Sequence, residues 1–274
     1  MIVNIVFDRY TLKSKWQTNY LDIINFKLKM NISFIIPCLN CSKFIGNTIK
    51  RLHKKLKKKR VIDYEIILID DGSTDETFRI LKKYASKKIR IIRNKKNIGK
   101  SASLIKGIKL SKMSKIVLID CDLPYFNYFE LILRKLNKEK FIYINRKSEK
   151  SKLIGKNLNL YQIARFFIGR IICLILNIFF FDKNIGDTQA GLKAFSKPKN
   201  FNKIQFVSKK FFLDAELMIL FNRSKIDMIS IPVNYKIYTN SSIKILSIEN
   251  FIYLFELTKI IFYYNFFKKK LIKL

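Results

Sequence analysis

The sequence contains little histidine and cysteine, which limits the metal and redox chemistry that it can support. It has one histidine and four cysteines in 274 residues, whereas a structural zinc site needs about four such ligands. Cys38 and Cys41 have the C-x-x-C spacing of zinc and redox sites, but the other two cysteines lie far away in apolar runs. Reduced, buried cysteines of a cytoplasmic protein are expected, with a functional thiol or metal pair as the less favoured alternative.

The sequence also lacks a long uncharged apolar stretch. A membrane-spanning helix needs about 18 to 20 such residues, whereas the longest run here, IICLILNIFFF at 171–181, is bounded by Arg170 and Asp182. The opening residues MIVNIVFDRYTLKSKW are interrupted by charge before the apolar core of a secretory signal develops. The sequence therefore predicts neither a spanning helix nor a secretory signal.

Acidic residues are scarce, so the chain is strongly basic. The 55 Lys and Arg residues outnumber the 20 Asp and Glu residues, and the formal net charge is +35. Such a surface favours phosphate in nucleic acid, at an anionic membrane or on a charged substrate. Low-GC coding yields the same composition, so charge alone does not choose among these partners. No nucleic acid is expected, because the base-stacking signatures of RNA-binding modules are missing; the basic run at 53–60 fits the solvated face of a helix.

Short β-branched runs alternate with polar helical stretches from residue 32 onward. This alternation is typical of a parallel sheet covered by helices on both sides, and it predicts an α/β domain. Strands are expected at 32–39, 64–71, 89–94, 115–122 and 140–147, and helices are expected near 42–58, 74–88, 99–112 and 127–138.

Polar residues follow each of the five expected strands. They are Asn40, DDGSTD at 70–75, NKKNIGK at 94–100, DCD at 120–122 and Arg146. Because ligands bind beyond the carboxyl ends of the strands in such sheets, we expect these five segments to converge on one crevice.

Asp120 and Asp122 form a D-x-D pair directly after an apolar strand. Side chains two apart in extended chain share a face, and each carboxylate there raises the cost of ionising the other. Mg²⁺ or Mn²⁺, hard cations that take oxygen ligands and often share them with a diphosphate, would relieve that repulsion. Asp70 and Asp71 form a second acidic pair, of which one residue is expected to accept a hydrogen bond from a nucleobase.

These stretches together resemble the family 2 glycosyltransferases, particularly the branch acting on dolichyl phosphate and other polyprenyl phosphates. The resemblance runs from about residue 32 to 245, and its order and spacing make it specific. The matching segments are FIIPCLN, YEIILIDDGSTDET, NIGKSASLIKGI, IVLIDCDL, GDTQAGLKAF, FFLDAELM and IPVNY.

The resemblance implies a GT-A, Rossmann-like nucleotide-sugar domain over residues 31–245. The implied nucleotide-sugar-binding residues are Pro37, Leu39, Asn40, Asp70, Asp71, Lys100, Asp120, Cys121, Arg146, Gln189 and Lys193. The implied metal ligands are Asp120 and Asp122, and the implied catalytic residues are Asp122, Asp187, Asp214 and Glu216. Asp71 is expected on the base, Arg146 on a phosphate, and Lys193 beside the leaving group or the acceptor phosphate.

The chain departs from the family pattern at several positions. Cys41 stands where an acid usually follows the Asn of the first motif, and Pro124 stands where a Gln often follows the D-x-D. Ser242 stands where a basic residue is common, although Lys236 and Lys244 are near.

The resemblance implies an inverting, metal-assisted transfer of a sugar from a nucleotide donor to polyprenyl phosphate at the cytoplasmic face of the membrane. One alternative is a hydroxyl acceptor, for which Asp187, Asp214 or Glu216 would be the base. A nucleotide-binding relic and a nucleic-acid-binding protein are the alternatives from other classes.

Three segments outside the motifs complete the expected organisation. Residues 1–30 form an appendage of unknown role. The apolar helix at 160–182 and the aromatic, basic segment at 246–274 are expected to lie along an anionic membrane surface. The alternative is that both pack on each other or on the sheet. Without spanning helices, a separate flippase would move any product across the bilayer.

Overall fold

The computed structural model describes residues 30–58, 63–136, 140–154, 160–181, 185–236 and 248–267. The expected appendage therefore lies outside the described residues except for Met30, and so do Ser242 and Lys244.

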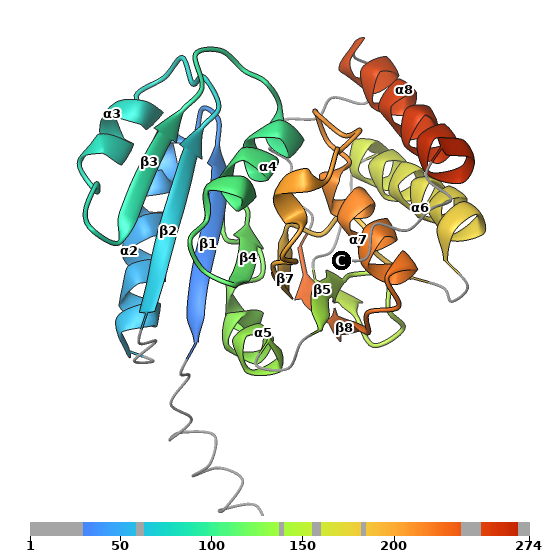
Figure 1. Cartoon of the computed structure of the whole chain (residues 1–274), viewed down its shortest axis with the longest axis horizontal. Coiled ribbons are helices and arrows are strands. Elements are labelled where there is room, and N and C mark those ends of the chain that lie inside the picture. Colours follow the sequence, from blue (N-terminus) through green and yellow to red (C-terminus); the bar gives the residue numbers. More distant parts are fainter. Residues whose placement is uncertain are drawn as a thin grey trace, which may run out of the picture.

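The described residues form a central sheet with helices on both faces (Figure 1). The strands are β1 (Asn31–Cys38), β2 (Asp63–Asp70), β3 (Ile89–Arg93), β4 (Lys115–Ile119), β5 (Phe141–Asn145), β6 (Lys152–Leu153), β7 (Leu192–Ser196), β8 (Met228–Pro232) and β9 (Asn234–Tyr235). The α-helices are α2 (Ser42–Lys58), α3 (Thr77–Lys82), α4 (Lys100–Leu110), α5 (Phe129–Lys135), α6 (Leu160–Phe180), α7 (Leu213–Arg223) and α8 (Ile248–Phe262), the last followed by a π-helical turn at Tyr263–Phe267.

The main sheet has seven strands in the order β3-β2-β1-β4-β7-β5-β8, and β6 pairs with β9 in a second, two-stranded sheet. Strand β7 runs antiparallel to both β4 and β5, whereas the other pairings of the main sheet are parallel. The predicted α/β class and mostly parallel sheet are confirmed, and the five predicted strands are β1 to β5. Strands β7 and β8 were not predicted as strands.

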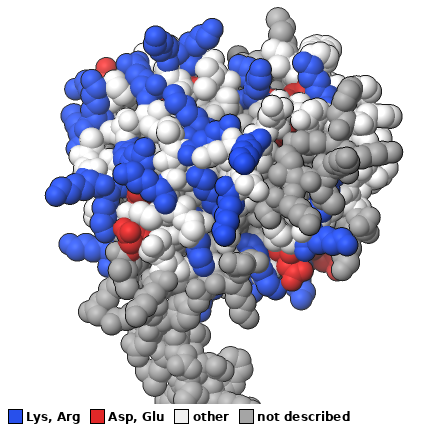
Figure 2. Space-filling model, viewed as in Figure 1, with Lys and Arg blue, Asp and Glu red and all other residues white. Residues whose placement is uncertain are grey.

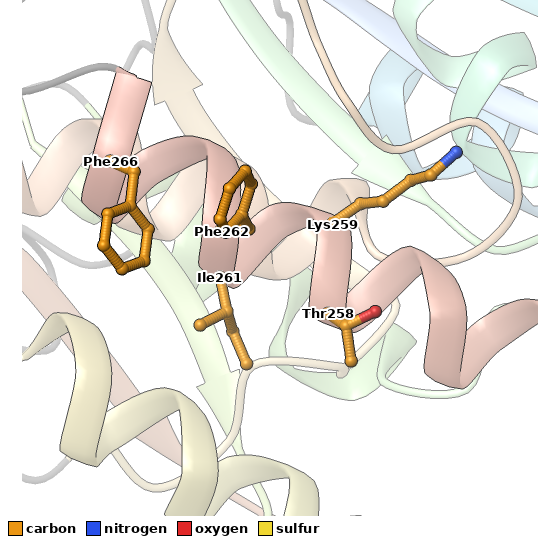
Figure 3. Close-up of a pocket in the computed structure, with 5 residues that line it drawn as sticks. All are labelled: Thr258, Lys259, Ile261, Phe262 and Phe266. Atoms are coloured by element: carbon orange, nitrogen blue, oxygen red, sulfur yellow. The ribbon is translucent and has the colours of Figure 1, made fainter.

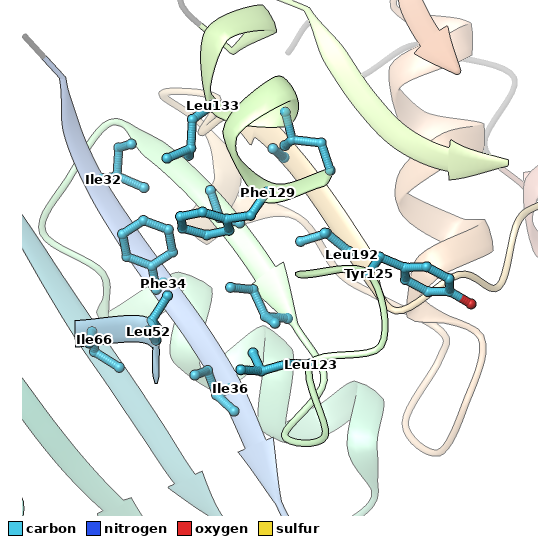
Figure 4. Packing of buried hydrophobic residues seen from close by; sticks show 14 of the residues in the cluster. Ile32, Phe34, Ile36, Leu52, Ile66, Leu123, Tyr125, Phe129, Leu133 and Leu192 are labelled. Carbon is cyan, nitrogen blue, oxygen red and sulfur yellow. The ribbon is translucent and has the colours of Figure 1, made fainter. Parts of the chain in front are cut away.

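Two hydrophobic layers hold the sheet between its helices. One layer joins α2, α3 and α5 to one face, and the other joins α4, α6, α7 and α8 to the opposite face. Figure 4 shows part of the first layer, where Phe34 and Ile36 of β1 lie against Leu52 of α2 and Phe129 of α5. The Phe34 and Phe129 rings have centroids 5.6 Å apart.

Helix α2 illustrates how the basic sequence folds around an apolar stripe. Ile45, Ile49, Leu52 and Leu56 are buried at helical spacing, and burying each such side chain stabilises the fold by roughly 1.5 to 3 kcal/mol. Lys54, Lys57 and Lys58 in its last turns are exposed, as predicted for this basic run, whereas the ammonium of Lys55 pairs with Glu130 at 2.7 Å. Figure 2 shows Lys and Arg side chains covering much of the face over the β1–β4 half of the molecule.

Helix α6 corrects one prediction. Within it, residues 162–180 are long and apolar enough to cross a membrane by length and composition alone. The longest uncharged run, 171–181, begins only after Arg170, whereas the helix starts at Leu160 and continues across Arg165 and Arg170. Such a helix by itself is weak evidence for a membrane span, because core helices of soluble proteins meet the same criterion.

The outer surfaces of α6 and α8 are strongly apolar. Their exposed large side chains are Leu160, Ile163, Phe167, Ile168, Ile171, Leu174, Ile178 and Phe179 on α6, and Phe251, Ile252, Leu254, Phe255 and Phe262 on α8. The two helices lie on the same side of the molecule (Figure 1) and both contribute buried residues to the second hydrophobic layer. The expected alternative, packing on the rest of the domain, therefore holds for one face of each helix only.

Candidate active site

The carboxyl ends of β1 and β4 lie beside each other, at the end of the sheet where the crevice is expected. The two strands are parallel neighbours, with Ile35 opposite Leu118, so the chain after each strand emerges at the same edge. Asn40, directly after β1, takes a left-handed conformation with φ of 49°. Its backbone N–H donates to the Ser73 hydroxyl at 3.0 Å, and its side-chain oxygen accepts from the Thr74 N–H at 2.9 Å. Asn40 thus joins the loops after β1 and β2, while the neighbouring Leu39 side chain is 42% exposed.

The two acids at the end of β2 hold neighbouring loops in place. Asp71 is buried, and its carboxylate accepts from the Asn94 side chain at 2.9 Å and from the backbone N–H groups of Ile98 and Gly99 at 3.0 and 2.9 Å. Asp70 is also buried and ion-paired with Arg93 at 3.1 Å. Asp71 therefore fixes the loop that leads into α4, and its contact with a nucleobase stays a prediction.

Asp120 has the side chain of Lys100 as its nearest charged partner. The Lys100 ammonium lies 2.6 Å from Asp120 Oδ1, and both side chains are about 30% exposed. Burial disfavours the charged lysine, but the nearby carboxylates of Asp120 and Asp214 outweigh it and raise the pKa of Lys100. Gly191 faces the other oxygen so closely that a side chain there would displace the carboxylate. The lysine and the glycine together fix where the Asp120 carboxylate lies.

Asp122 is the more exposed member of the D-x-D pair. Its partial burial and the neighbouring Asp120 raise its pKa, because a second negative charge is costly there. A divalent cation would remove that cost, so the pair fits Mg²⁺ or Mn²⁺. Among the described residues no cluster of three or more acidic, cysteine or histidine side chains is suited to a metal. The protein thus offers two carboxylates, and the remaining oxygens would come from the diphosphate and water.

Arg146 and Asp187 form a two-pronged ion pair at the end of β5. The Arg146 Nε and Nη2 atoms lie 2.5 and 3.0 Å from the two oxygens of Asp187. Asp187 is completely buried; burial opposes its ionisation, but the Arg146 guanidinium holds the pKa of Asp187 well below its usual range. Gln189, two residues further on, has buried amide atoms without a hydrogen-bond partner among the described residues. An unsatisfied buried amide is costly; a phosphate oxygen of a substrate would accept from its NH₂ group, and a substrate hydroxyl would also donate to its oxygen.

Lys193 and Asp214 form a second buried ion pair. Their nearest atoms are 2.9 Å apart, and Lys193, completely buried, also donates to the Ala190 carbonyl oxygen at 2.6 Å. This arrangement engages Lys193 within the protein, so its predicted contact with a leaving group or acceptor phosphate has no support in the geometry.

Glu216 is likewise fully engaged. Its two oxygens accept from the backbone N–H groups of Val207 and Ser208 at 2.8 and 2.9 Å, and from the Tyr264 hydroxyl at 2.6 Å. Burial raises its pKa, but the side chain has no exposed surface. Its predicted role as a base therefore has no geometric support, and its position indicates a role in holding the segment before α7.

Cys121 lies between the two metal-binding candidates but packs against the hydrophobic core. The Thr48 hydroxyl donates to its carbonyl oxygen at 2.6 Å. Cys38 and Cys41 are free and buried, as expected for reduced cysteines, and hydrogen bonds from Cys121 and Cys38 lower the pKa of Cys41. Pro37, on β1, is half-buried. Contacts of Pro37 and Cys121 with a nucleotide stay predictions.

Some residues that shape the site were missed from the sequence. Asn94 is buried and joins Asp71 to the Ser103 hydroxyl at 2.8 Å, and Gly191 makes room for Asp120. Glu256 of α8 binds the segment before α7. Glu256 is one of two acids in the aromatic segment that forms α8, which was the available signal for it, and the glycine of the DTQAGLK motif was the signal for Gly191.

Residues 33–200, more than half of the chain, match the family described as Glycosyl transferase family 2. The dolichyl-phosphate beta-glucosyltransferase of Dictyostelium discoideum is 28% identical over 74% of this chain and 66% of its own length. The human dolichyl-phosphate beta-glucosyltransferase is 26% identical over 83% of this chain and 74% of its own length. The chain thus spans about two thirds to three quarters of the length of these relatives.

Solved structures support the fold. The glucosyl-3-phosphoglycerate synthase of Mycobacterium tuberculosis with Mn²⁺, uridine-diphosphate-glucose and phosphoglyceric acid aligns with a TM-score of 0.62 at 15% identity, covering 88% of this chain and 82% of that one. The same enzyme with uridine diphosphate aligns with a TM-score of 0.61 at 16% identity, over 88% and 83% of the two chains. Motifs, sheet order and these matches agree: the chain belongs to glycosyl transferase family 2.

Proposed function

We propose that this protein transfers glucose from a uridine-diphosphate donor to a polyprenyl phosphate at the cytoplasmic face of a membrane, with inversion at the sugar carbon. The names of its relatives, which act on dolichyl phosphate, support the acceptor and the sugar. The uridine-diphosphate-glucose and Mn²⁺ bound to a protein of the same fold support the donor and the metal.

The observation that carries the choice of acceptor is that the candidate bases are occupied. Asp187 is paired with Arg146, Asp214 with Lys193, and Glu216 with backbone amides. A hydroxyl acceptor must lose its proton to a base, whereas a phosphate is already ionised near neutral pH, its second pKa being about 6. The arrangement therefore favours a phosphate acceptor.

The donor end of the crevice has the features that a nucleotide diphosphate needs. Asp122 and the lysine-held Asp120 supply oxygen ligands for a divalent cation, which when bound would neutralise charge on the departing diphosphate. The Lys100 ammonium adds positive charge at the same place. The unsatisfied Gln189 amide lies in the loop that also supplies Gly191 against Asp120, which suits a contact with the sugar or the acceptor phosphate.

The apolar outer faces of α6 and α8 suit an enzyme whose acceptor is a lipid. Helix α6 is joined to the loop at the crevice, since the Asn177 side chain exchanges hydrogen bonds with the backbone of Ile185 at 2.7 and 3.1 Å. A helix seated in the headgroup region with Lys and Arg around it gains about 1 kcal/mol per basic residue near anionic lipid. The product would then need a separate flippase to cross the bilayer.

Sugar transfer from radiolabelled UDP-glucose, with and without polyprenyl phosphate in anionic vesicles, tests the proposal. We expect Mn²⁺-dependent product only with the phosphate present, and loss of that product on the substitution Asp122→Asn. Equal transfer to the unphosphorylated polyprenol would contradict the acceptor. Absence of transfer together with salt-sensitive RNA retention that survives Asp122→Asn would contradict the enzyme itself.

A further inference from the structure

The segment 207–213, which leads into α7 and includes its first residue, has every one of its backbone N–H groups bonded to a side chain. Glu216 accepts from the first two, and the Ser101 hydroxyl accepts from the last at 3.0 Å. The four amides between them, at residues 209–212, all donate to the carboxylate of Glu256 on α8, at distances of 2.7 to 3.3 Å for the last three. One carboxylate from α8 therefore sets the course of this segment.

The carbonyl oxygens of the same segment bind the start of α4. The N–H groups of Ser101 and Ala102 donate to the carbonyl oxygens of Lys210 and Lys209 at 3.1 and 2.8 Å. The Ser208 and Ser101 hydroxyls are 2.9 Å apart. The free N–H groups of the first helical turn thus find their acceptors in the segment that Glu256 holds.

The start of α4 also carries Lys100, which binds Asp120 at 2.6 Å. The residues just before α4 are held by Asp71, whose carboxylate accepts from the backbone N–H groups of Ile98 and Gly99. A continuous chain of contacts consequently runs from Glu256 through residues 209–210 and Lys100 to the D-x-D carboxylate.

Glu256 occupies the inner face of a helix whose outer face is apolar. It is 7% exposed, whereas Phe251, Leu254 and Phe255 on the same helix are 76%, 55% and 61% exposed. Figure 3 shows the groove that continues this surface at the carboxyl-terminal end of α8, lined by Thr258, Ile261 and Phe266 among others. A surface that binds the outer face of α8 also holds Glu256 in place, because both belong to the same helix.

We propose that Glu256 is a positioning residue that couples the seating of α8 on a lipid surface to the placement of Lys100 and Asp120. The coupling rests on the proposed function, because it assumes a membrane on one side and a nucleotide with its cation on the other. A lipid surface that orders α8 orders the segment 209–212, and so tightens the site for the nucleotide. By reciprocity, bound nucleotide and cation strengthen attachment to lipid by the same factor.

The substitution Glu256→Gln separates the coupling from the lipid contact. Glutamine offers one acceptor oxygen, and its NH₂ group faces amides that also donate, so four N–H groups cannot all be satisfied. The outer face of α8 is unchanged, so binding to vesicles is retained. Glu76→Gln is the matched control, because Glu76 is an exposed acid on the far side of the sheet, paired with Arg79.

The measurement is the affinity for UDP with Mn²⁺, by calorimetry on the full chain, with and without vesicles of phosphatidylglycerol and phosphatidylcholine that contain no polyprenyl phosphate. We expect vesicles to tighten UDP binding by about fivefold or more for the wild type and for Glu76→Gln. For Glu256→Gln we expect equal vesicle sedimentation but no such gain. A full gain in Glu256→Gln overturns the coupling.

Two further outcomes are separable. Failure of the wild type to bind UDP with Mn²⁺ in either condition refutes the proposed function, whereas binding that vesicles leave unchanged refutes the coupling alone. If Glu256→Gln does not fold, Phe255→Ser replaces it, since that change is confined to the exposed face. Phe255→Ser is expected to keep the affinity measured without vesicles and to lose the gain with them; retention of the gain at reduced vesicle binding overturns the coupling.

Discussion

Replacing Gly191 by alanine tests whether the position of the Asp120 carboxylate decides catalysis. An added Cβ would stand 1.7 Å from where Asp120 Oδ2 lies and 2.3 Å from its Cγ, whereas ordinary contact begins at 3.4 Å. The carboxylate must therefore move by roughly 1.7 Å, the difference between the first and last of these distances. Gly191 is half-buried at the edge of the sheet, so the cheapest adjustment is a swing of the Asp120 side chain.

A displacement of that size is large for the metal ligand that we propose Asp120 to be. Misplacing a catalytic group by about 1 Å can lower the rate by about 100-fold, so we expect kcat of Gly191→Ala to fall by at least that factor. The concentration of Mn²⁺ needed for half-maximal rate should rise at the same time. The melting temperature should change little, because the Asp120 side chain is partly exposed and its displacement breaks only its solvent-accessible contact with Lys100.

Gly169→Ala is the matched control for this experiment. It makes the same chemical change on α6, where an added Cβ meets nothing within 4 Å. The assay is transfer from UDP-glucose to polyprenyl phosphate over a range of Mn²⁺ concentrations, with thermal unfolding recorded for both variants. Wild-type rate and Mn²⁺ response in Gly191→Ala would refute the assignment of Asp120 to the reacting centre.

The further predictions concern three charged groups. Asp187→Asn strands the Arg146 guanidinium and should lower the free energy of unfolding by about 3 kcal/mol in urea titrations; an unchanged value would contradict the pairing. The depressed pKa of Asp187 also predicts a pH dependence. The ionised carboxylate stabilises the folded state fully above about pH 4, and this stabilisation is lost as the pH falls through the lower pKa of the folded state. Acid unfolding curves of the wild type should therefore show a decline in stability that those of Asp187→Asn lack. The raised pKa of Asp122 predicts that Mn²⁺ affinity, followed by electron paramagnetic resonance, weakens at a higher pH than an ordinary aspartate would give. Lys100→Met removes a competitor for Asp120 and should tighten Mn²⁺ binding without nucleotide by about fivefold; weaker binding would show that Lys100 supports the ion instead.

The first half of the fold was predictable because its signals are local. Runs such as IVLID and EIILID have the β-branched composition of buried parallel strands, and polar loops follow each one. Because the carboxyl ends of parallel strands lie at the same end of the sheet, Asn40, Asp71 and Asp120 are placed together without any knowledge of which strands are neighbours.

The second half depended on contacts between distant residues. Nothing in the sequence around Lys193 shows that its ammonium pairs with Asp214 inside the protein instead of with a substrate, because the partner comes from another element. The same is true of Glu216, whose acceptor atoms are taken by amides nine and eight residues earlier. The motif resemblance marked these residues as important, and only the fold shows that they act on the protein's own backbone.

The reversed direction of β7 decides which parts of the chain can meet. A strand that runs against its neighbours begins where they finish, so the residues leading into it, 185–191, arrive at the same rim as the loops that leave β4 and β5. Were β7 turned the other way, Gly191 and the partner of Arg146 would stand at the opposite rim, and the two halves of the crevice would never face each other.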